Sequence, residues 1–352
     1  MKKINVGIIY GGKSTEHEVS VRSAKSVFEA LNKEKYNISL INITKQGEWL
    51  LAADNKKIKP LDNANSKKIS VIPSEGLTAD GQRIELDAVL PILHGTAGED
   101  GSIQGLLELA ELPYAGCSVR SSAVCMDKDM TKRLLELKGI KVAPSIVLNY
   151  YEKDGHTYEQ AREQLGVPMF VKPVNQGSSV GVSKVSDEPS FYKALDSAFS
   201  FDTKVMIESG IEGREIEVSV LGNEELFVSV PGEIVSQTDF YSYSSKYLDE
   251  NGALLNIPAQ LEEEEMQRIQ QIAYDTFKVL DCEGMARVDV FLTPDGEVIV
   301  NEVNTLPGFT SISMYPKLLE ASGIPYSETL DRLIELSLER YERSERLKTD
   351  IS

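Results

Sequence analysis

Cysteine, histidine and tryptophan are scarce in this chain of 352 residues, which has three, three and one of them. Cys117, Cys125 and Cys282 lack the spacing of metal ligands, and their odd number does not fit a full set of disulfides. A reduced, cytoplasmic protein is therefore expected. No apolar run approaches the roughly 20 residues that cross a bilayer, and the amino terminus predicts a strand instead of a signal peptide.

An excess of positive charge is also missing. The chain has 37 Lys and Arg against 55 Asp and Glu, a formal net charge of −18. This balance argues against nucleic acid or an anionic membrane as a partner, because few cations are available to neutralise phosphates. A small anionic ligand stays possible, since a local cluster of Lys and Arg can override the overall field. The length predicts two or three domains, and no internal repeat divides the chain.

The first third alternates strands and helices, which predicts parallel strands with helical crossovers and ligands at the strands' carboxyl ends. We assign residues 1–121 to this doubly wound α/β domain, and we expect the polar stretch 54–68 to be a surface excursion. The predicted elements are strands at Val6–Tyr10, Tyr36–Thr44 and Ala88–Leu93 and helices at Val19–Asn32 and Ile103–Ala110.

Two further units follow, with mixed α+β patterns. Residues 122–208 predict a small lobe, and residues 209–352 predict a second lobe with a long loop, 236–258, that is poor in periodicity. The predicted elements include a helix at Lys128–Gly139, strands at Met169–Pro173, Val180–Val185 and Lys204–Glu208, a strand pair at Arg214–Gly222 and Leu226–Val230, and helices at Glu262–Asp281 and Pro325–Arg346.

A hairpin near the carboxyl terminus has the most informative pattern. Pro294–Gly296 is a turn signal between two strand-like runs, and a register set by it places Arg287 opposite Glu302 and Asp289 opposite Val300. One face would then hold polar groups at one end and apolar groups at the other, suited to a metal-bound triphosphate and an adenine. The alternative is a solvated sheet face with an Arg–Glu pair. The residues of that face are Arg287, Asp289, Phe291, Val300, Glu302 and Asn304.

Two other segments fit an anionic nucleotide. Lys172 ends a strand, and the small residues 177–181 follow it, so backbone amides and a cation can approach phosphate oxygens. An ordinary hairpin with a surface lysine is the alternative. Glu215 lies on a strand face where a carboxylate can accept ribose hydroxyls, and Glu208 can contact an adenine amine. An acidic, solvated strand is the alternative there.

The order of these segments resembles the ATP-grasp superfamily, in which ATP lies between two α+β lobes. The resemblance implies two Mg²⁺ ions, with Mn²⁺ possible, held by Asp289, Glu302 and Asn304. It also implies that the following residues bind the nucleotide: Lys128, Lys172, Ser179, Glu208, Glu215, Lys246 and Phe291.

Four segments narrow the resemblance to the D-alanine–D-alanine ligase family, and this match covers nearly the whole chain. The segments are Tyr10–Ser20, Leu93–Gly101, Phe240–Tyr247 and Asn304–Met314. The implied reaction is ATP-dependent formation of D-alanyl-D-alanine through a D-alanyl phosphate, for peptidoglycan precursor synthesis. A D-alanine–D-lactate or D-alanine–D-serine ligase is the alternative within the family. A nucleotide-binding module without catalysis and an oxidoreductase are the alternatives from other classes.

The resemblance also implies roles for individual residues and a homodimer. Glu18 would hold the first substrate's ammonium group and form a hydrogen-bonded group with Ser178 and Tyr247, and Tyr247 fits D-alanine as the second substrate. The implied catalytic residues are Glu18, Ser178, Tyr247, Arg287 and Gly308, and the implied substrate-binding residues are His94, Ser311, Ser313 and Met314.

Overall fold

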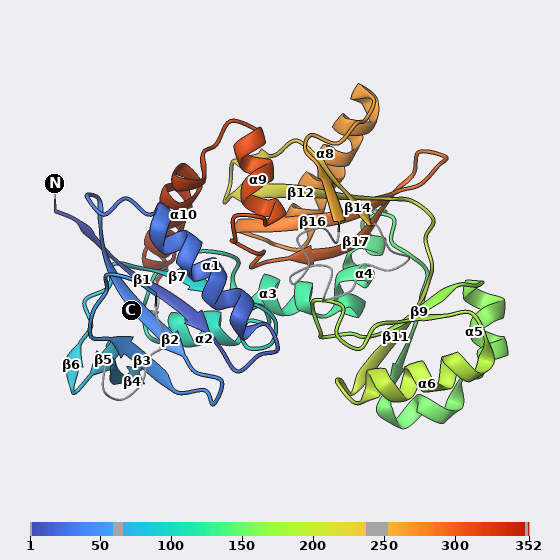
Figure 1. Cartoon of the computed structure of the whole chain (residues 1–352), viewed down its shortest axis with the longest axis horizontal. Helices are drawn as coiled ribbons and strands as arrows, with labels where there is room; N and C mark the ends of the chain where they lie inside the picture. Colours follow the sequence, from blue (N-terminus) through green and yellow to red (C-terminus); the bar gives the residue numbers. More distant parts are fainter. Residues whose placement is uncertain (1, 59–65, 237–252, 349–350, 352) are drawn as a thin grey trace.

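In the part of the chain that the structure describes, three β-sheets follow one another and span residues 4–92, 145–209 and 214–304 (Figure 1). The computed structural model describes residues 2–58, 66–236, 253–348 and 351. No helix within these ranges is both long and apolar enough to cross a membrane. The predicted domain limits at 121 and 208 stay predictions. The limit at 121 falls between the first two sheets, and β11 ends at Ser209, one residue beyond the limit at 208.

The amino-terminal sheet combines parallel and antiparallel strands in the order β6-β5-β4-β3-β2-β1-β7. Its parallel strands are β1 (Ile4–Gly11), β2 (Tyr36–Ile43) and β7 (Ala88–Ile92). Helices α1 (His17–Ala30) and α2 (Ser102–Leu109) cover opposite faces, because alternate β1 side chains enter two separate cores. The doubly wound arrangement is therefore confirmed for the parallel part.

We predicted that residues 54–68 form an irregular surface segment. This prediction is wrong for residues 66–68, which begin a strand. Four antiparallel strands extend the sheet beyond β2: β3 (Trp49–Ala52), β4 (Ser66–Ile72), β5 (Gly76–Ala79) and β6 (Gln82–Arg83). The sequence pattern missed β4 because its first residues include the polar Lys67 and Lys68, whose side chains are exposed. Ile69, the next residue, is buried in the core beside α2.

The central lobe has a core of its own and stands apart at the lower right of Figure 1. Its sheet has the order β10-β9-β11-β8. The chain reaches it through α3 (Val119–Met126) and α4 (Lys128–Leu137). Its elements are β8 (Ser145–Asn149), the 3-10 helix η1 (Tyr150–Gly155), α5 (Tyr158–Leu165), β9 (Met169–Pro173), β10 (Ser183–Val185), α6 (Glu188–Phe199) and β11 (Lys204–Ser209).

The carboxyl-terminal sheet has the order β15-β14-β12-β16-β17, and β13 pairs with β12. Its inner face packs against α8 through Ile269, Ala273 and Phe277. Its elements are β12 (Arg214–Gly222), β13 (Leu226–Val228), β14 (Gly232–Ser236), β15 (Ala253–Asn256), α8 (Glu263–Val279), β16 (Gly284–Leu292), β17 (Val298–Asn304) and α9 (Met314–Ala321).

The register predicted for the hairpin is wrong for two reasons: the strands already pair one residue away from the predicted register beside the turn, and a bulge in β17 then adds a further shift. Asp289 pairs with Glu302, and the next residue, Val290, pairs with Val300. Asn301 is therefore an extra residue on β17, and both it and Glu302 line a cleft. Val300, which we predicted on the polar face, lies instead in the core beneath the sheet and is 1% exposed.

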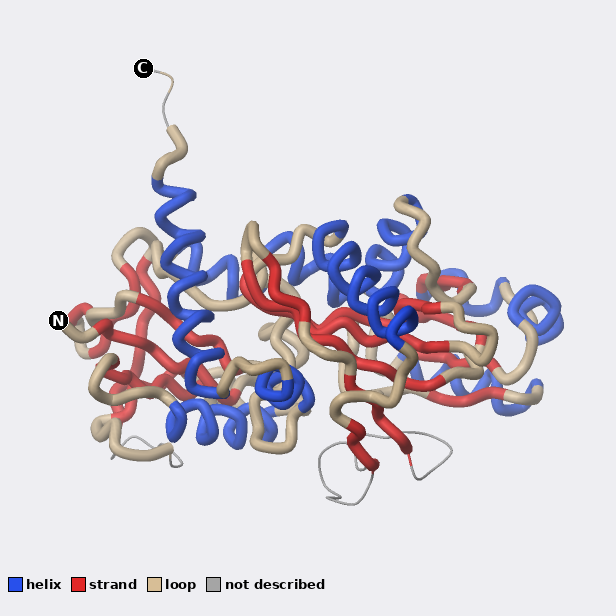
Figure 2. The backbone as a smooth tube through the Cα atoms, turned by 90° about the horizontal axis from the view of Figure 1, so that it is seen from above, coloured by secondary structure: helices blue, strands red, loops and turns tan. Residues whose placement is uncertain are grey.

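Helix α10 (Tyr326–Glu345) returns from the last sheet to the first, and the chain ends beyond it (Figure 2). Leu330 and Leu333 lie in the same core as β1 and β7. Arg340 donates to the carbonyl oxygen of Tyr114 at 2.7 Å and also to that of Gly116. The last helix therefore fastens the carboxyl-terminal sheet to the amino-terminal sheet, although these are far apart in the sequence.

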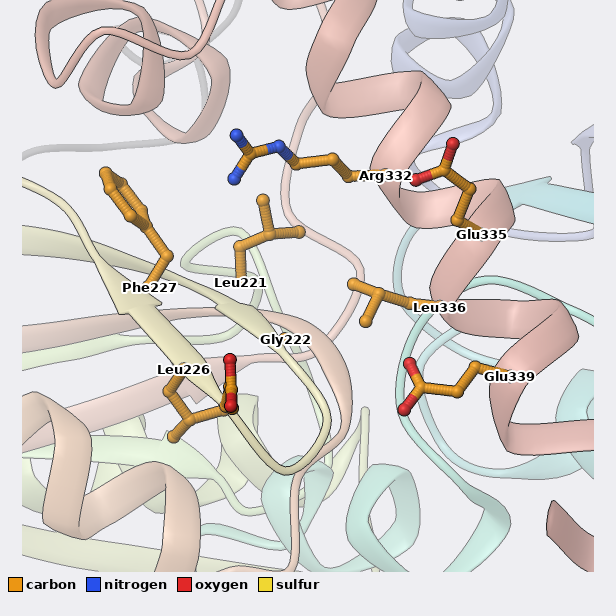
Figure 3. Close-up of a pocket in the computed structure, with 9 residues that line it drawn as sticks. Leu221, Gly222, Leu226, Phe227, Arg332, Glu335, Leu336 and Glu339 are labelled. Atoms are coloured by element: carbon orange, nitrogen blue, oxygen red, sulfur yellow. The ribbon is translucent and has the colours of Figure 1, made fainter.

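A cleft of about 470 Å³ separates this helix from the turn between β12 and β13 (Figure 3). Arg332 and Glu335 of α10 line one side, and Leu221 and Phe227 line the other. None of the predicted site residues that the structure describes lies in this cleft.

We expect Leu330→Ala to lower the free energy of unfolding by about 2–5 kcal/mol, because Leu330 is 0% exposed and its loss leaves a cavity in the shared core. Urea unfolding measures the change. Leu347→Ala is the matched control, since Leu347 is 71% exposed and should change stability by less than about 0.5 kcal/mol. Equal effects of the two changes would contradict the packing of α10.

Candidate functional site

A cleft of about 610 Å³ lies between the central and carboxyl-terminal sheets. This volume is typical of sites for small molecules and cofactors. Both walls offer apolar side chains, and the chain linking the two sheets forms part of the lining. The lining includes Lys128, Val167, Phe170, Lys172, Gly177, Ser178, Ser179, Glu208, Ile211, Glu215, Phe291, Asn301 and Glu302. Six of the seven residues predicted to bind a nucleotide therefore lie in one cleft, and Lys246 lies outside the described residues.

Lys128 and Lys172 supply positive charge to this cleft, which the exposed Lys184 also lines. The Lys128 Nζ donates to the carbonyl oxygen of Gln176 at 2.7 Å and lies 3.8 Å from Glu302 Oε2. Burial lowers the pKa of Lys128, and its attraction to Glu302 opposes that shift. The Lys172 Nζ lies 2.7 Å from Glu208 Oε2. Lys128 and Lys172 thus each have a carboxylate nearby, and a phosphate could replace or add to that partner.

The loop after Lys172 has an unusual backbone. Ser178 and Ser179 have φ angles of 50° and 59°, in the left-handed region that residues other than glycine seldom adopt. Such conformations cost about 1–3 kcal/mol each and often occur where a loop binds a ligand. Both residues line the cleft, as expected of a loop whose amides face an anion.

The partner of Ser178 corrects one sequence prediction. Ser178 Oγ donates to Glu16 Oε1, whereas Glu18 is exposed and pairs with Lys45 Nζ at 2.7 Å. Helix α1 begins at His17, so Glu16 stays at its buried end while Glu18 turns toward solvent. A Cβ on Gly95 would lie 2.5 Å from Glu16 Oε2, which shows how closely that loop approaches the carboxylate.

His94 links the amino-terminal sheet to the loop after β17. Its Nδ1 lies 3.0 Å from the Leu306 carbonyl oxygen, and its Nε2 lies 3.1 Å from Ser23 Oγ. Nδ1 must donate to a carbonyl, and in a neutral ring Nε2 would then accept from Ser23 Oγ. Burial lowers the pKa of His94, which agrees with this state. Both ring nitrogens are engaged by the protein, so the predicted contact with substrate would have to be made by another part of His94.

Glu99 lies beside this histidine and was not predicted as a site residue. Its Oε1 accepts a hydrogen bond from the Gly95 amide at 3.0 Å and lies 3.9 Å from His94 Nδ1. Burial and the charge of Glu16 raise the pKa of Glu99 to about 8. A strongly raised pKa in a carboxylate cluster is typical of functional sites.

The hairpin residues form a charged network. Arg287 Nε and Nη2 donate to the two carboxylate oxygens of Asp289, each at 2.7 Å, and Nε also lies 2.9 Å from Glu217 Oε2. Asn304 Nδ2 donates to Asp289 Oδ2 at 3.0 Å. Arg287, Asp289, Glu302 and Asn304 therefore lie on neighbouring positions of β16 and β17, as the sequence predicted, despite the altered register.

These side chains fit a hard divalent cation in their chemistry. Asp289, Glu302 and Asn304 offer oxygen atoms from paired strand positions, and Mg²⁺ commonly uses one or two carboxylates together with substrate phosphates and water. Within the described ranges, no three His, Cys, Asp or Glu residues gather closely enough to hold a metal by themselves. A nucleotide's oxygens would thus complete the coordination.

The loop between β17 and α9 is held by its own contacts. Thr310 N donates to Ser313 Oγ at 3.0 Å, and a Cβ on Gly308 would lie 2.8 Å from the same oxygen. A side chain at position 308 would therefore displace the Ser313 hydroxyl from this contact. Ser313 precedes α9, whose first residue is Met314, so amides at this helix start are available to an anion. The Met314 side chain is buried, and Ser311 is exposed.

Sequence reasoning missed several residues that the structure brings to the site. The sequence could have indicated two of them. Lys132 lies four residues after Lys128 on one helix, and Glu16 lies within the same motif as Glu18. Asn301 could be found only from the bulge. Tyr247, predicted with Ser178, lies outside the described residues, as does Lys246. The residues missed are Glu16, Glu99, Lys132, Glu217 and Asn301.

Comparison with known proteins agrees with this geometry. A family model described as D-ala D-ala ligase N-terminus matches residues 5–117, and one described as D-ala D-ala ligase C-terminus matches residues 134–335. A D-alanine--D-alanine ligase of Oceanobacillus iheyensis is 50% identical and aligns over 100% of both chains.

Solved structures are similar over nearly the whole chain. The D-alanine-D-alanine ligase from Coxiella burnetii has a TM-score of 0.89 and 40% identity, over 98% of this chain and 97% of its own. The VanG D-Ala:D-Ser ligase from Enterococcus faecalis has a TM-score of 0.87 and 39% identity, over 96% and 100%. These matches confirm the fold class predicted from the sequence.

We expect Glu99 to make stability fall with rising pH. Its folded-state pKa of about 8 exceeds the ordinary glutamate pKa of 4.5, so the folded protein keeps a proton that the unfolded chain releases between these values. The free energy of unfolding should therefore decrease as pH rises through this window, with a contribution of at most about 1.4 kcal/mol per pH unit.

Urea unfolding of the wild type and Glu99→Gln from acid to neutral pH measures this effect. The variant should have a flatter profile, because glutamine cannot release the proton. Glu320→Gln, at an exposed position, is the control and should retain the wild-type slope. Parallel profiles for the wild type and Glu99→Gln would refute the raised pKa.

Proposed function

Because this chain belongs to the D-alanine–D-alanine ligase family, we propose that it joins two D-alanine molecules, with conversion of ATP to ADP and phosphate. The observation that carries this proposal is the adjacency of two sites. The same loop places Ser179 in the nucleotide-sized cleft and Ser178 against Glu16. A carboxylate-bearing substrate held near Glu16 would therefore lie beside the terminal phosphate.

The nucleotide would lie with its base toward the apolar side chains of the cleft and its phosphates toward the lysines. Phe170 and Phe291 line opposite walls, and Glu215 lines the cleft where it can accept ribose hydroxyls. Lys128, Lys172 and the amides near Ser179 would hold the phosphates, together with Lys246 as the family resemblance implies.

Asp289, Glu302 and Asn304 would hold divalent metal. We propose two Mg²⁺ ions, which Mn²⁺ can replace, as the resemblance implies. When bound, these ions supply positive charge to the phosphoryl group in transfer. Arg287, held by Asp289 and Glu217, adds a fixed positive charge that does not depend on the metal.

The first D-alanine would be fixed through its ammonium group. Glu16 takes the role that we had assigned to Glu18, because Glu16 is buried and bound to Ser178. The substrate's carboxylate would attack the γ-phosphorus of ATP, releasing ADP and giving an acyl phosphate. Tyr247, as the resemblance implies, would complete the group formed by Glu16 and Ser178.

The amine of the second D-alanine would then attack the acyl carbon, and phosphate would leave. Arg287 and the Gly308 amide would stabilise the oxyanion of the tetrahedral intermediate. Ser313 and the Met314 amide, at the start of α9, would hold the second carboxylate, with Ser311 beside them. His94 would act by holding the Leu306 carbonyl and thus this loop.

The product D-alanyl-D-alanine would serve peptidoglycan precursor synthesis. All three cysteines are free thiols, which favours a reducing compartment, and we place the reaction in the cytoplasm. The homodimer that the resemblance implies stays a prediction.

A second candidate function is ligation of D-alanine to D-serine. The observation in its favour is the similarity, at 39% identity, to the VanG D-Ala:D-Ser ligase. D-lactate is a third acceptor of similar size. The three products differ in mass, so one experiment separates them.

We expect ADP release when ATP, Mg²⁺ and D-alanine are supplied together, with D-alanyl-D-alanine as the product. Mass spectrometry of products identifies the second substrate when D-serine or D-lactate is added, and L-alanine is the stereochemical control. ADP formed only with D-serine or D-lactate would replace the proposed acceptor. Nucleotide binding without ADP under any condition would leave a non-catalytic module.

We expect Glu16→Gln to lower kcat/KM for the first D-alanine by about 10- to 150-fold. The reason is that hydrogen bonds to charged groups contribute about 1.5–3 kcal/mol. Glu18→Gln is the matched control, because its exposed pair with Lys45 contributes at most about 1 kcal/mol and lies apart from Ser178. Steady-state kinetics at saturating ATP measure both. A larger loss in Glu18→Gln than in Glu16→Gln would restore the original assignment.

A further inference from the structure

Lys132 is a buried cation behind the nucleotide cleft. It lies one helical turn after Lys128 in α4 and is 4% exposed. Its Nζ donates to the Ala143 carbonyl oxygen at 2.7 Å and forms a close ion pair with Glu208 Oε1. Two contacts therefore fix the ammonium group. Lys132 is not among the residues that line the cleft, whereas Glu208 is.

Glu208 is shared between two lysines of different character. Its Oε2 lies 2.7 Å from Lys172 Nζ, and its Oε1 pairs with Lys132. Lys172 lines the cleft and, under the proposed function, contacts phosphate oxygens. Lys132 has no such access. It is therefore the cation that stays with Glu208 when the nucleotide engages Lys172.

A permanent cation determines the chemical state of this carboxylate. Glu208 is 5% exposed, and a buried carboxylate without a partner tends to take up a proton. Burial raises the pKa of Glu208, but Lys172 and Lys132 outweigh it and hold the pKa below its usual value. An ionised carboxylate only accepts hydrogen bonds, whereas a protonated one can also donate.

The position of Glu208 points to the base of the nucleotide. Glu208 on β11 lies directly opposite Phe170 on β9, so both side chains share one sheet face. Phe170 and Ile211 also line the cleft, and Phe291 lines it from the carboxyl-terminal sheet. A flat ring between these apolar side chains would present its edge to Glu208.

We propose that Lys132 is a positioning residue that keeps Glu208 an acceptor and thereby selects a purine with a 6-amino group. The inference rests on the proposed use of ATP. Adenine carries a hydrogen-bond donor at position 6, where guanine and hypoxanthine carry an acceptor. A 6-oxo group would face the carboxylate as a second acceptor, and buried polar groups left unpaired in this way discriminate strongly.

The test compares kcat/KM for ATP and ITP, since hypoxanthine carries oxygen where adenine carries the amine. Wild type should prefer ATP by more than about 100-fold. Lys132→Met should reduce this ratio by at least about tenfold, because Glu208 loses its permanent cation. Lys132→Arg should retain most of the preference, since it preserves the charge. A purely structural role of Lys132 would lower activity with both nucleotides equally and would overturn the proposal.

Lys141→Met is the matched control, because Lys141 is an exposed lysine paired with Glu297 and should leave the ratio unchanged. Glu208→Gln provides a second variant if Lys132→Met does not fold. Its carboxamide offers a donor as well as an acceptor, so the preference for ATP should fall. An unchanged ratio in Glu208→Gln, or equal use of ATP and ITP by the wild type, would also overturn the proposal.

The same assay separates this inference from the proposed function. A wild-type protein that forms no product from ATP and D-alanine would refute the ligase reaction itself. Normal product formation with a nucleotide ratio that Lys132→Met does not alter would refute only the role of Lys132.

Discussion

The bulge in β17 is the constraint on which the cleft depends. Side chains of a regular strand alternate between the two faces of a sheet, so a shift of one residue exchanges core and surface. Val298 and Val300 pack in the core, and without an extra residue the same alternation would also place Glu302 there. Asn301 absorbs the shift, so Glu302 and Asn304 lie beside Asp289 while the valines stay buried. One irregular residue thus reconciles an apolar core with a cluster of oxygen ligands.

The charges of the cleft are arranged in pairs before any ligand binds. In an acidic protein, an anion site needs local cations, and buried cations need partners. Lys128 faces Glu302 and Lys172 faces Glu208 in the cleft lining, and Arg287 faces Asp289 on the adjoining strand β16. A bound phosphate would supply new negative charge to these lysines, and a metal would compensate the carboxylates that they release. When a ligand binds, each lysine would therefore replace a carboxylate partner with a phosphate, and no charged side chain would be left buried without an opposite charge.

Sequence patterns predicted the elements with strong periodicity and failed where tertiary contacts decide. The strand Arg214–Gly222 and the helix near Pro325–Arg346 follow directly from their apolar spacing. The attachment of that helix to the first sheet could not be predicted, because amphipathicity identifies a buried face without its partner.

The predicted hairpin register was displaced by one residue at the turn, and it assumed a regular ladder, so it also missed the bulge. Glu18 was preferred over Glu16 within one motif, although only the start of α1 decides which of them is buried. Lys132 was not predicted as a site residue, because the sequence does not distinguish it from the solvent-exposed charges of an amphipathic helix.

The loop 176–179 couples the two halves of the proposed reaction. Lys128 holds the Gln176 carbonyl, Ser178 binds Glu16 of the amino-terminal domain, and Ser179 lines the nucleotide cleft. The left-handed backbone at both serines fixes the directions in which these contacts leave the loop. A substrate ammonium bound near Glu16 and phosphates bound near Ser179 would therefore share one rigid support. Phosphoryl transfer needs its reacting atoms aligned within a few tenths of an ångström, and a shared support meets that need better than two independent loops would.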